Sequence, residues 1–269
     1  MIPASLTEKV SSLLVEAAAT EILPRFRALQ AHDVQEKSGP NDLVTAADLA
    51  SEAFLTPRLR ELIPGSLVVG EEAVSADANV LNRLLRDDYV WIIDPVDGTY
   101  NFVHGDPGFG VIVALLKNGV TVGGWMHAPV EGGNMAAEKG AGAFENGVRL
   151  HVAKPGPIRE MRSVLYVGAE RSPALYQRIK QVKNEIGPRS HRRCAAMEYF
   201  GLARGQIHYA IFNKLLPWDH AAGAHIVEEA GGYLRCMDGD SYVPAGRESP
   251  LLVAPDAATW HTLHKFYTA

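Results

Sequence analysis

The chain has 269 residues, of which 47% are hydrophobic, and a formal net charge of −5. This length allows one large domain or two packed subdomains, and the acidic balance argues against a general nucleic-acid-binding protein, which usually carries a basic surplus. No run approaches the roughly 18 consecutive apolar residues of a membrane span, and the two cysteines have neither a metal-ligand spacing nor the number needed for a disulfide framework. We therefore expect a cytoplasmic protein with no membrane or nucleic-acid partner.

The first half of the chain is predicted to contain helices followed by antiparallel strands. Ser5 begins a capping box for a long first helix, and Thr45 to Asp48 begins a second helix that extends to about Leu62. The polar stretch 35–42 between them is rich in turn residues and is expected to be a mobile loop. Strands are predicted at 67–70, 89–94, 109–116, 120–127, 143–145 and 148–152, with Asn-Gly hairpin turns at 118–119 and 146–147 and a helix near 78–85.

From about residue 155 onward, strands alternate with helices. Strands are predicted at 163–167, 207–212 and 251–254, and helices at 173–186, 195–204 and 217–230 and at the C-terminus. We expect an N-terminal α+β subdomain at 1–154 and a C-terminal α/β subdomain at 155–269, packed as one unit.

Several acidic residues follow apolar strands or begin a helix. Asp94 and Asp97 end the run VWIIDPVDG, and Glu71 follows the strand 67–70. Asp219 lies in the first turn of the helix 217–230. Such groups can converge, and a cluster of anions is tolerated only when it is protonated or neutralised by cations. Oxygen ligands without cysteine or paired histidines favour Mg²⁺ over Zn²⁺.

The turn after Asp97 has features that suit a phosphate group. The backbone N–H groups of Gly98 and Thr99 could receive a phosphate oxygen, and the Thr99 hydroxyl could orient or deprotonate a water. Taken singly, these features have simpler explanations: Asp97-Gly98 as an ordinary turn, Asp219 as a favourable helix-start carboxylate, and Glu71-Glu72 as a solvated pair. Their occurrence together and in this order favours a functional site over these simpler explanations.

Three motifs resemble the signatures of the inositol monophosphatase family of Mg²⁺-dependent, lithium-sensitive phosphatases. They are Gly70-Glu71-Glu72, Asp94-Pro95-Val96-Asp97-Gly98-Thr99 and Trp218-Asp219-His220-Ala221-Ala222-Gly223. The resemblance extends over roughly residues 35 to 235. It implies a layered αβαβα sandwich of the inositol monophosphatase and fructose-1,6-bisphosphatase type, usually assembled as a homodimer.

The resemblance also implies a site for about two to three Mg²⁺ ions per subunit, which clamp the attacking and leaving oxygens. The implied metal ligands are Glu71, Asp94, the backbone carbonyl of Val96, Asp97 and Asp219. Thr99, supported by Asp48 and Glu71, would activate the attacking water, and Lys37 would lie on a mobile loop near the third ion. The implied phosphate and substrate contacts are Asp97, Gly98, Thr99, Arg193, Cys194, Ala195 and Phe212.

The substrate end departs from the inositol-type pattern. That pattern has Gly-Ser/Thr-Ala where this chain has Arg193-Cys194-Ala195, and a hydroxyl-binding glutamate where this chain has Phe212. Arg193 is expected to begin a helix beside the pocket and to pair with an anionic group, the alternative being that it points to solvent with Arg192.

We expect a small phosphorylated polyol or sugar as substrate, as for an inositol-1-monophosphatase. The alternative substrates are fructose 1,6-bisphosphate, histidinol phosphate and 3′-phosphoadenosine 5′-phosphate. A non-catalytic regulatory dimer is the alternative of another class. In a non-catalytic dimer, some of the metal ligands should be replaced by other residues. All the implied carboxylates and Thr99 are present in this chain.

Overall fold

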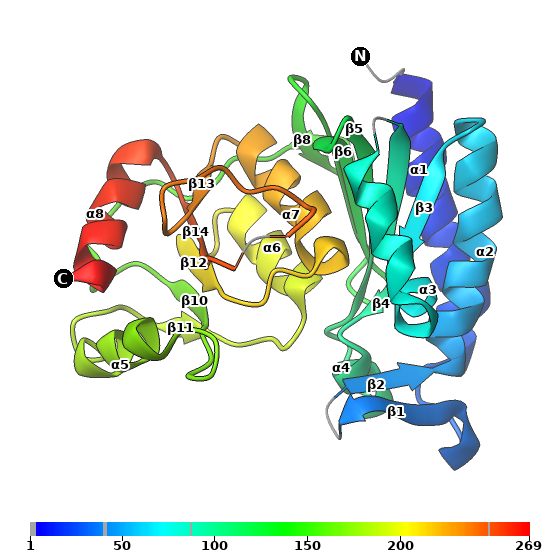
Figure 1. The fold of residues 1–269 in the computed structure, drawn as a ribbon, viewed down its shortest axis with the longest axis horizontal. Coiled ribbons are helices and arrows are strands. Elements are labelled where there is room, and N and C mark those ends of the chain that lie inside the picture. Colours follow the sequence, from blue (N-terminus) through cyan, green and yellow to red (C-terminus); the bar gives the residue numbers. More distant parts are fainter. Residues whose placement is uncertain (1–3, 40–41, 87, 247) are drawn as a thin grey trace.

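The computed structural model describes residues 4–39, 42–86, 88–246 and 248–269. Figure 1 shows five layers. Helices α1 (Ala4–Ala17) and α2 (Ala46–Leu62) form one outer layer and cover a seven-stranded sheet. Helices α6 (Ala195–Ala203) and α7 (Pro217–Glu229) separate this sheet from a five-stranded sheet, whose outer face is covered by α5 (Pro173–Gln181) and α8 (Ala257–Thr268). This is the αβαβα sandwich that the resemblance implied.

The seven-stranded sheet is built almost entirely from neighbouring strands joined by hairpins. Its strands, in spatial order, are β3 (Leu67–Gly70), β4 (Tyr89–Asp97), β5 (Gly110–Lys117), β6 (Val120–Ala128), β7 (Gly133–Glu138), β8 (Gly142–Glu145) and β9 (Val148–Arg149). Only β3 and β4 are parallel among these pairs. Asn118 and Asn146 both have positive φ, as the two expected Asn-Gly turns require. The sequence did not predict β7, because its alanines and glycine carry little strand preference.

The five-stranded sheet mixes parallel and antiparallel pairs. Its strands, in spatial order, are β11 (Arg189–Ser190), β10 (Ser163–Tyr166), β12 (Tyr209–Phe212), β14 (Leu251–Ala254) and β13 (Tyr233–Cys236). Strand β10 is parallel to β11 and β12, and β14 is antiparallel to β12 and β13. All four residues of β12 and of β14 are buried, as expected for strands covered by helices on both faces.

Alternation along β4 explains how its sheet holds helices on both faces. Trp91 and Ile93 belong to the apolar cluster beneath α1 and α2, whereas Ile92 belongs to the cluster around α6 and α7. Successive side chains of a strand point to opposite faces, so a continuous apolar run fills both layers. A third cluster, which includes Trp260 and Leu263 of α8, fills the outer face of the five-stranded sheet.

The structure corrects several local expectations. Ser5 lies inside α1, which already includes Ala4, so it is not a helix cap. The stretch 35–42 is not a loop throughout. Strands β1 (Val34–Gly39) and β2 (Asp42–Thr45) pair antiparallel there, and Pro40 and Asn41 lie outside the described residues. The turn residues in this stretch predict a loop, but residues 35–39 extend a strand that pairs with β2.

Three helices also differ in extent or type. Helix α3 (Glu71–Ala76) was not expected, and the predicted helix at 78–85 is a 3₁₀ helix, Ala78–Leu85. Helix α5 ends at Gln181 instead of residue 186, and turns follow it. A π-helical segment, Ala18–Ile22, and two short 3₁₀ turns, Leu23–Arg25 and Ala31–Asp33, connect α1 to β1. The subdomain boundary at 154/155 stays a prediction, although sheet membership changes between Arg149 and Ser163.

Within the described ranges, no helix combines the length and apolar character needed to cross a membrane.

Candidate active site

Three aspartates from two layers meet at one point. Asp94 and Asp97 end β4, Asp219 lies in the first turn of α7, and α7 packs against β4. One carboxylate oxygen from each of the three lies within 4.8 Å of the others. Asp94 and Asp97 are only 2% and 8% exposed. The structure thus brings together three of the carboxylates that the sequence singled out.

Burial makes this cluster electrostatically costly. Burial and the charges of neighbouring carboxylates raise the pKa of Asp94 and Asp219 well above the usual range. Burial also raises the pKa of Asp97, although hydrogen bonds from the Cys194 thiol and the Ala196 N–H oppose this rise. A bound cation would remove the repulsion, and three carboxylate oxygens are the donors that a hard cation such as Mg²⁺ prefers. The residues present therefore fit a magnesium site.

A break in the register of β4 explains how Asp94 and Asp97 reach the same site. In a regular strand, residues three apart point to opposite faces. The pairing of β4 with β5 shifts between Asp94 and Asp97, and the Val96 N–H donates to Asp94 Oδ1 at 3.1 Å. Gly98 follows with φ of +84°, and a Cβ there would lie 3.0 Å from the Cβ of Cys194. The sequence Asp-Pro-Val-Asp-Gly thus encodes a local bulge.

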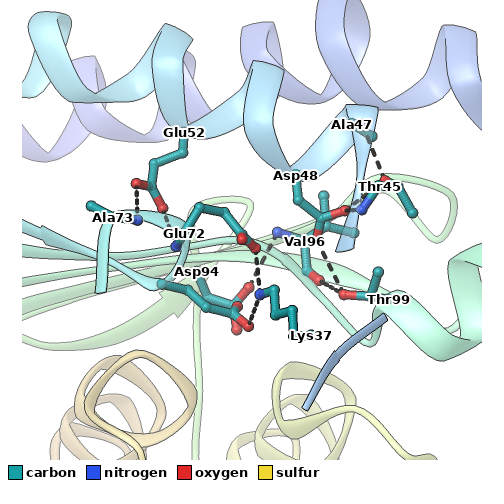
Figure 2. Close-up of polar contacts among 11 residues, drawn as sticks. Lys37, Thr45, Ala47, Asp48, Glu52, Glu72, Ala73, Asp94, Val96 and Thr99 are labelled. Carbon is teal, nitrogen blue, oxygen red and sulfur yellow. Dashed lines mark hydrogen bonds and ion pairs between the residues drawn. The ribbon is translucent and has the colours of Figure 1, made fainter. Parts of the chain in front are cut away.

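The start of α3 is fixed by a buried carboxylate from α2. Glu52 accepts hydrogen bonds from the backbone N–H groups of Glu72, at 2.8 Å, and Ala73, at 2.9 Å (Figure 2). A Cβ on Gly70 would lie 2.2 Å from the carboxyl carbon of Glu52, so glycine is required at that position. Glu52 therefore sets where Glu71 projects. Sequence reasoning missed it because no local pattern connects residues 20 apart.

Lys37 neutralises the acidic pair at this helix start. Its Nζ donates to Glu71 Oε1 at 2.9 Å and to Glu72 Oε1 at 2.8 Å, and Figure 2 shows it beside Glu72. Burial lowers the pKa of Lys37, but the attraction of Glu71 and the hydrogen bonds to both carboxylates outweigh this effect and raise it overall. The expectation that Lys37 lies on a loop is wrong, because it lies in β1. Glu71 contacts Lys37 and is not part of the group of three aspartates.

Thr99 connects the aspartate group to α2. Its hydroxyl lies 3.1 Å from Asp48 Oδ1 and 3.0 Å from the carbonyl oxygen of Val96 (Figure 2). A hydroxyl carries one hydrogen, so it donates to one of these oxygens at a time. Asp48 is fully buried, and its other oxygen accepts the Thr45 N–H at 2.8 Å as part of the predicted capping box. Burial raises the pKa of Asp48 to about 6, so this carboxylate is mostly ionised at neutral pH and is able to accept the Thr99 hydrogen.

A pocket of about 630 Å³ opens beside the aspartates. Its lining includes Asp97 and Asp219, and also Arg193, Cys194, Ala195 and Phe212. Cys194 is buried, its Sγ lies 3.0 Å from Asp97 Oδ2, and burial raises the pKa of this thiol well above its usual value. Cys194 and the Ala196 N–H, which donates to the same oxygen at 2.5 Å, therefore fix the orientation of Asp97.

Aromatic rings form one wall of this pocket. The Tyr166 and Phe212 rings stack, with centroids 6.1 Å apart and planes 13° apart. His191 packs against Tyr166 with a centroid distance of 4.8 Å. Tyr100 and Lys214 also line the pocket. Of these residues, sequence reasoning named only Phe212. The others lacked a motif, because they come together from separate elements.

Arg193 and Arg192 point in different directions. Arg192 Nη2 forms an ion pair with Glu131 Oε1 at 2.9 Å, whereas the Arg193 guanidinium carbon lies 4.8 Å from the ring centroid of Tyr100. Arg193 does not begin the helix as expected, since α6 starts at Ala195 with Cys194 as its N-cap. With φ of +53°, Arg193 has a left-handed conformation that is incompatible with a helix start.

Comparison with known proteins finds one family over nearly the whole chain. The model of the inositol monophosphatase family matches residues 5–267. The chain is 30% identical over 207 residues to the fructose-1,6-bisphosphatase/inositol-1-monophosphatase of Thermotoga maritima, covering 77% of this chain and 76% of that protein. It is 34% identical over 215 residues to the inositol-1-monophosphatase of Bacillus subtilis, covering 78% of each. The solved structure of a Thermotoga maritima IMPase superposes with a TM-score of 0.82 at 25% identity and covers 97% of this chain and 96% of that one.

Proposed function

Because the chain belongs to the inositol monophosphatase family, whose members hydrolyse phosphomonoesters, we propose that its aspartate cluster holds Mg²⁺ for hydrolysis of a small phosphorylated metabolite. The observation that carries this proposal is the meeting of Asp94, Asp97 and Asp219 within 4.8 Å, two of which also line the adjacent pocket. The same family membership favours an enzyme over the non-catalytic dimer.

The proposed metal ligands are the three aspartates, Glu71 and the Val96 carbonyl, for two to three ions per subunit. Glu71 is close enough to Asp94 for its charge to raise the pKa of Asp94, which supports its inclusion. When bound, Mg²⁺ would polarise the phosphate and lower the pKa of a water.

The chain's own residues supply orientation and proton transfer. Thr99 donates its hydrogen to Asp48 or to Val96 O, which leaves the hydroxyl oxygen able to accept a hydrogen bond from the attacking water. Asp48 holds Thr99 in this orientation while its carboxylate is ionised. We also propose that the backbone N–H groups of Gly98 and Thr99 contact the phosphate. These contributions are mainly positioning and electrostatics.

The pocket favours a substrate with a second anionic group. Arg193 and Lys214 supply positive charge to it, and Phe212 is an apolar wall where a hydroxyl-binding carboxylate would suit inositol. Fructose 1,6-bisphosphate is one candidate, supported by the name of the Thermotoga maritima relative. 3′-Phosphoadenosine 5′-phosphate is the second, supported by the stacked rings of Tyr166 and Phe212, against which a flat base could pack. Histidinol phosphate carries an ammonium group, which Arg193 would repel.

A substrate panel tests this proposal. The purified protein should hydrolyse at least one of these two bisphosphates faster than inositol 1-phosphate or histidinol phosphate in the presence of Mg²⁺. Activity should vanish with EDTA and return when excess Mg²⁺ is added. Full turnover in chelator would contradict the metal assignment, and the highest rate on inositol 1-phosphate would contradict the substrate assignment.

The charge of Arg193 should raise activity on doubly charged substrates relative to singly charged ones. We expect Arg193→Ala to lower kcat/KM for fructose 1,6-bisphosphate by about ten- to a hundredfold, because a charge-assisted contact is lost. Inositol 1-phosphate should lose much less. Arg192→Ala is the matched control, since it removes the same charge one residue away from a side chain that pairs with Glu131. Equal losses of kcat/KM on both substrates would show that Arg193 does not contact the second anionic group of the substrate.

Three further properties are proposed from the family resemblance alone. They are a homodimeric assembly, a cytoplasmic location and inhibition by submillimolar to millimolar lithium. Sedimentation of the purified protein, fractionation of cells and a lithium titration at fixed Mg²⁺ would test them separately.

A further inference from the structure

A buried carboxylate on α6 plays no part in the chemistry described so far. Glu198 is completely buried and faces residues 190–193, the segment that ends in Arg193 (segment 190–193 below). A buried carboxyl group must be satisfied by hydrogen bonds. The partners of Glu198 therefore indicate what it holds in place.

Glu198 receives hydrogen bonds from two residues of segment 190–193. Its Oε2 accepts from the Ser190 hydroxyl at 2.9 Å, and its Oε1 accepts from the Arg192 N–H at 2.5 Å. The Arg192 carbonyl is held as well, because it accepts from Asn101 Nδ2 at 2.8 Å. The peptide groups on both sides of Arg192 are thus anchored to buried side chains.

Tyr166 extends this network to Arg193. The Arg193 N–H donates to the Tyr166 hydroxyl at 2.6 Å, and this hydroxyl lies 3.2 Å from Glu198 Oε1. The hydroxyl has one hydrogen and accepts from Arg193, so it donates that hydrogen to Glu198. The bonds run in one direction, from the Arg193 N–H through Tyr166 to the carboxylate.

This network explains an unfavourable backbone conformation. Arg193 has φ of +53°, a region that residues other than glycine seldom occupy unless their surroundings hold them there. With its N–H fixed, Arg193 projects over Tyr100 and lines the pocket, while Arg192 turns away to Glu131. In an ordinary extended conformation the side chain of Arg193 would leave in another direction.

We propose that Glu198 is a positioning residue for substrate selection. Through the Arg192 N–H and through Tyr166, it holds segment 190–193 so that the Arg193 guanidinium faces the second anionic group of the substrate. This inference rests on the proposed function, in which Arg193 reads that group.

The first test does not need enzymatic activity. Hydrogen exchange of the individual amides, measured by NMR, should show the Arg192 and Arg193 amides protected although both side chains are exposed. Tyr166→Phe keeps the ring stacked on Phe212 and removes only the hydroxyl. It should speed exchange at Arg193 and leave Arg192 protected. In Glu198→Gln, whose amide has a single acceptor oxygen, exchange at Arg192 or at Arg193 should become faster. Unchanged exchange at both amides in both variants would overturn the proposal.

The second test asks whether this positioning matters for selection. Tyr166→Phe should lower kcat/KM for the doubly charged substrate relative to kcat/KM for inositol 1-phosphate. The ratio should fall by roughly three- to tenfold, a size typical of coupling between residues in contact. The change should appear mainly in KM. In an Arg193→Ala background, the same substitution should not change this ratio further. Additive effects would show that Tyr166 acts independently of Arg193 and would overturn the proposal. If the wild type hydrolyses none of the panel, the proposed function fails, and the exchange measurement still decides whether Glu198 and Tyr166 hold Arg193.

Discussion

Asp94→Asn should abolish phosphatase activity and at the same time stabilise the metal-free protein. Asp94 is 2% exposed, and burial together with the charges of four neighbouring carboxylates raises its pKa; they belong to Glu71, Asp97, Asp219 and Asp48. An asparagine removes one of these repelling charges and keeps an oxygen that can accept the Val96 N–H. In EDTA the melting temperature should therefore rise above that of the wild type.

The same substitution should remove the response to metal. Ligand binding stabilises a fold by mass action, so Mg²⁺ should raise the melting temperature of the wild type. This rise should disappear in Asp94→Asn, and kcat/KM should fall by more than about a hundredfold, the upper cost of losing even an outer partner of a metal ligand. Asp88→Asn is a matched surface control, with its side chain 46% exposed and paired to Arg86. A lower melting temperature in EDTA together with a preserved Mg²⁺ response would exclude Asp94 as a ligand.

Thr99→Ala should reduce kcat by about 10²–10⁴-fold, the range for loss of a positioned proton-transfer group. KM should change little, because orientation of the attacking water matters mainly in the transition state. The substitution removes the hydroxyl contacts to Asp48 and to Val96 O, at 3.1 and 3.0 Å, together with the methyl group. Stopped assays at saturating substrate and Mg²⁺ would measure the effect.

Thr99→Ser provides the matched control for this prediction. Serine keeps the hydroxyl and removes only the methyl group, so it should recover most of kcat. A normal kcat in Thr99→Ala would mean that Thr99 serves only to begin α4 (Thr99–Val103). Equal losses in the alanine and serine variants would point to packing of the methyl group instead of the hydroxyl.

The carboxylates could be found from the sequence because each lies next to a strong local signal. Asp94 and Asp97 end a long apolar run, and Asp219 directly follows the Pro217-Trp218 start of a helix. Apolar runs and Asn-Gly pairs likewise predicted most strands of the larger sheet. Each of these patterns involves only a few consecutive residues, so the sequence alone is sufficient to recognise them.

The residues that hold the site in place left no such signal. Lys37 and Glu71 are 34 positions apart, and Tyr166 and Glu198 are 32 apart. Each pair meets only because elements distant in the sequence pack together. The hairpin at 34–45 was missed for a different reason: its strands are polar, and the breakers between them dominated the pattern. Arg193 was misplaced because its positive φ depends on a buried glutamate that sequence reasoning did not connect to it.

Asp219 lies on α7, opposite Asp94 and Asp97 on β4. Under the proposed function, catalytic turnover would therefore show whether the two layers are packed together. Neither the seven-stranded sheet nor the middle helices contain all three aspartates. Chain segments separated by a cut in the connection between Arg149 and Ser163 would each lack part of the proposed metal site and would recover it only by associating. Even in the intact chain, a brief detachment of α7 would silence catalysis while the larger sheet remained folded. A cation bridging the two layers would oppose that detachment, so the ion required for chemistry would also fasten together the parts of the chain that perform it.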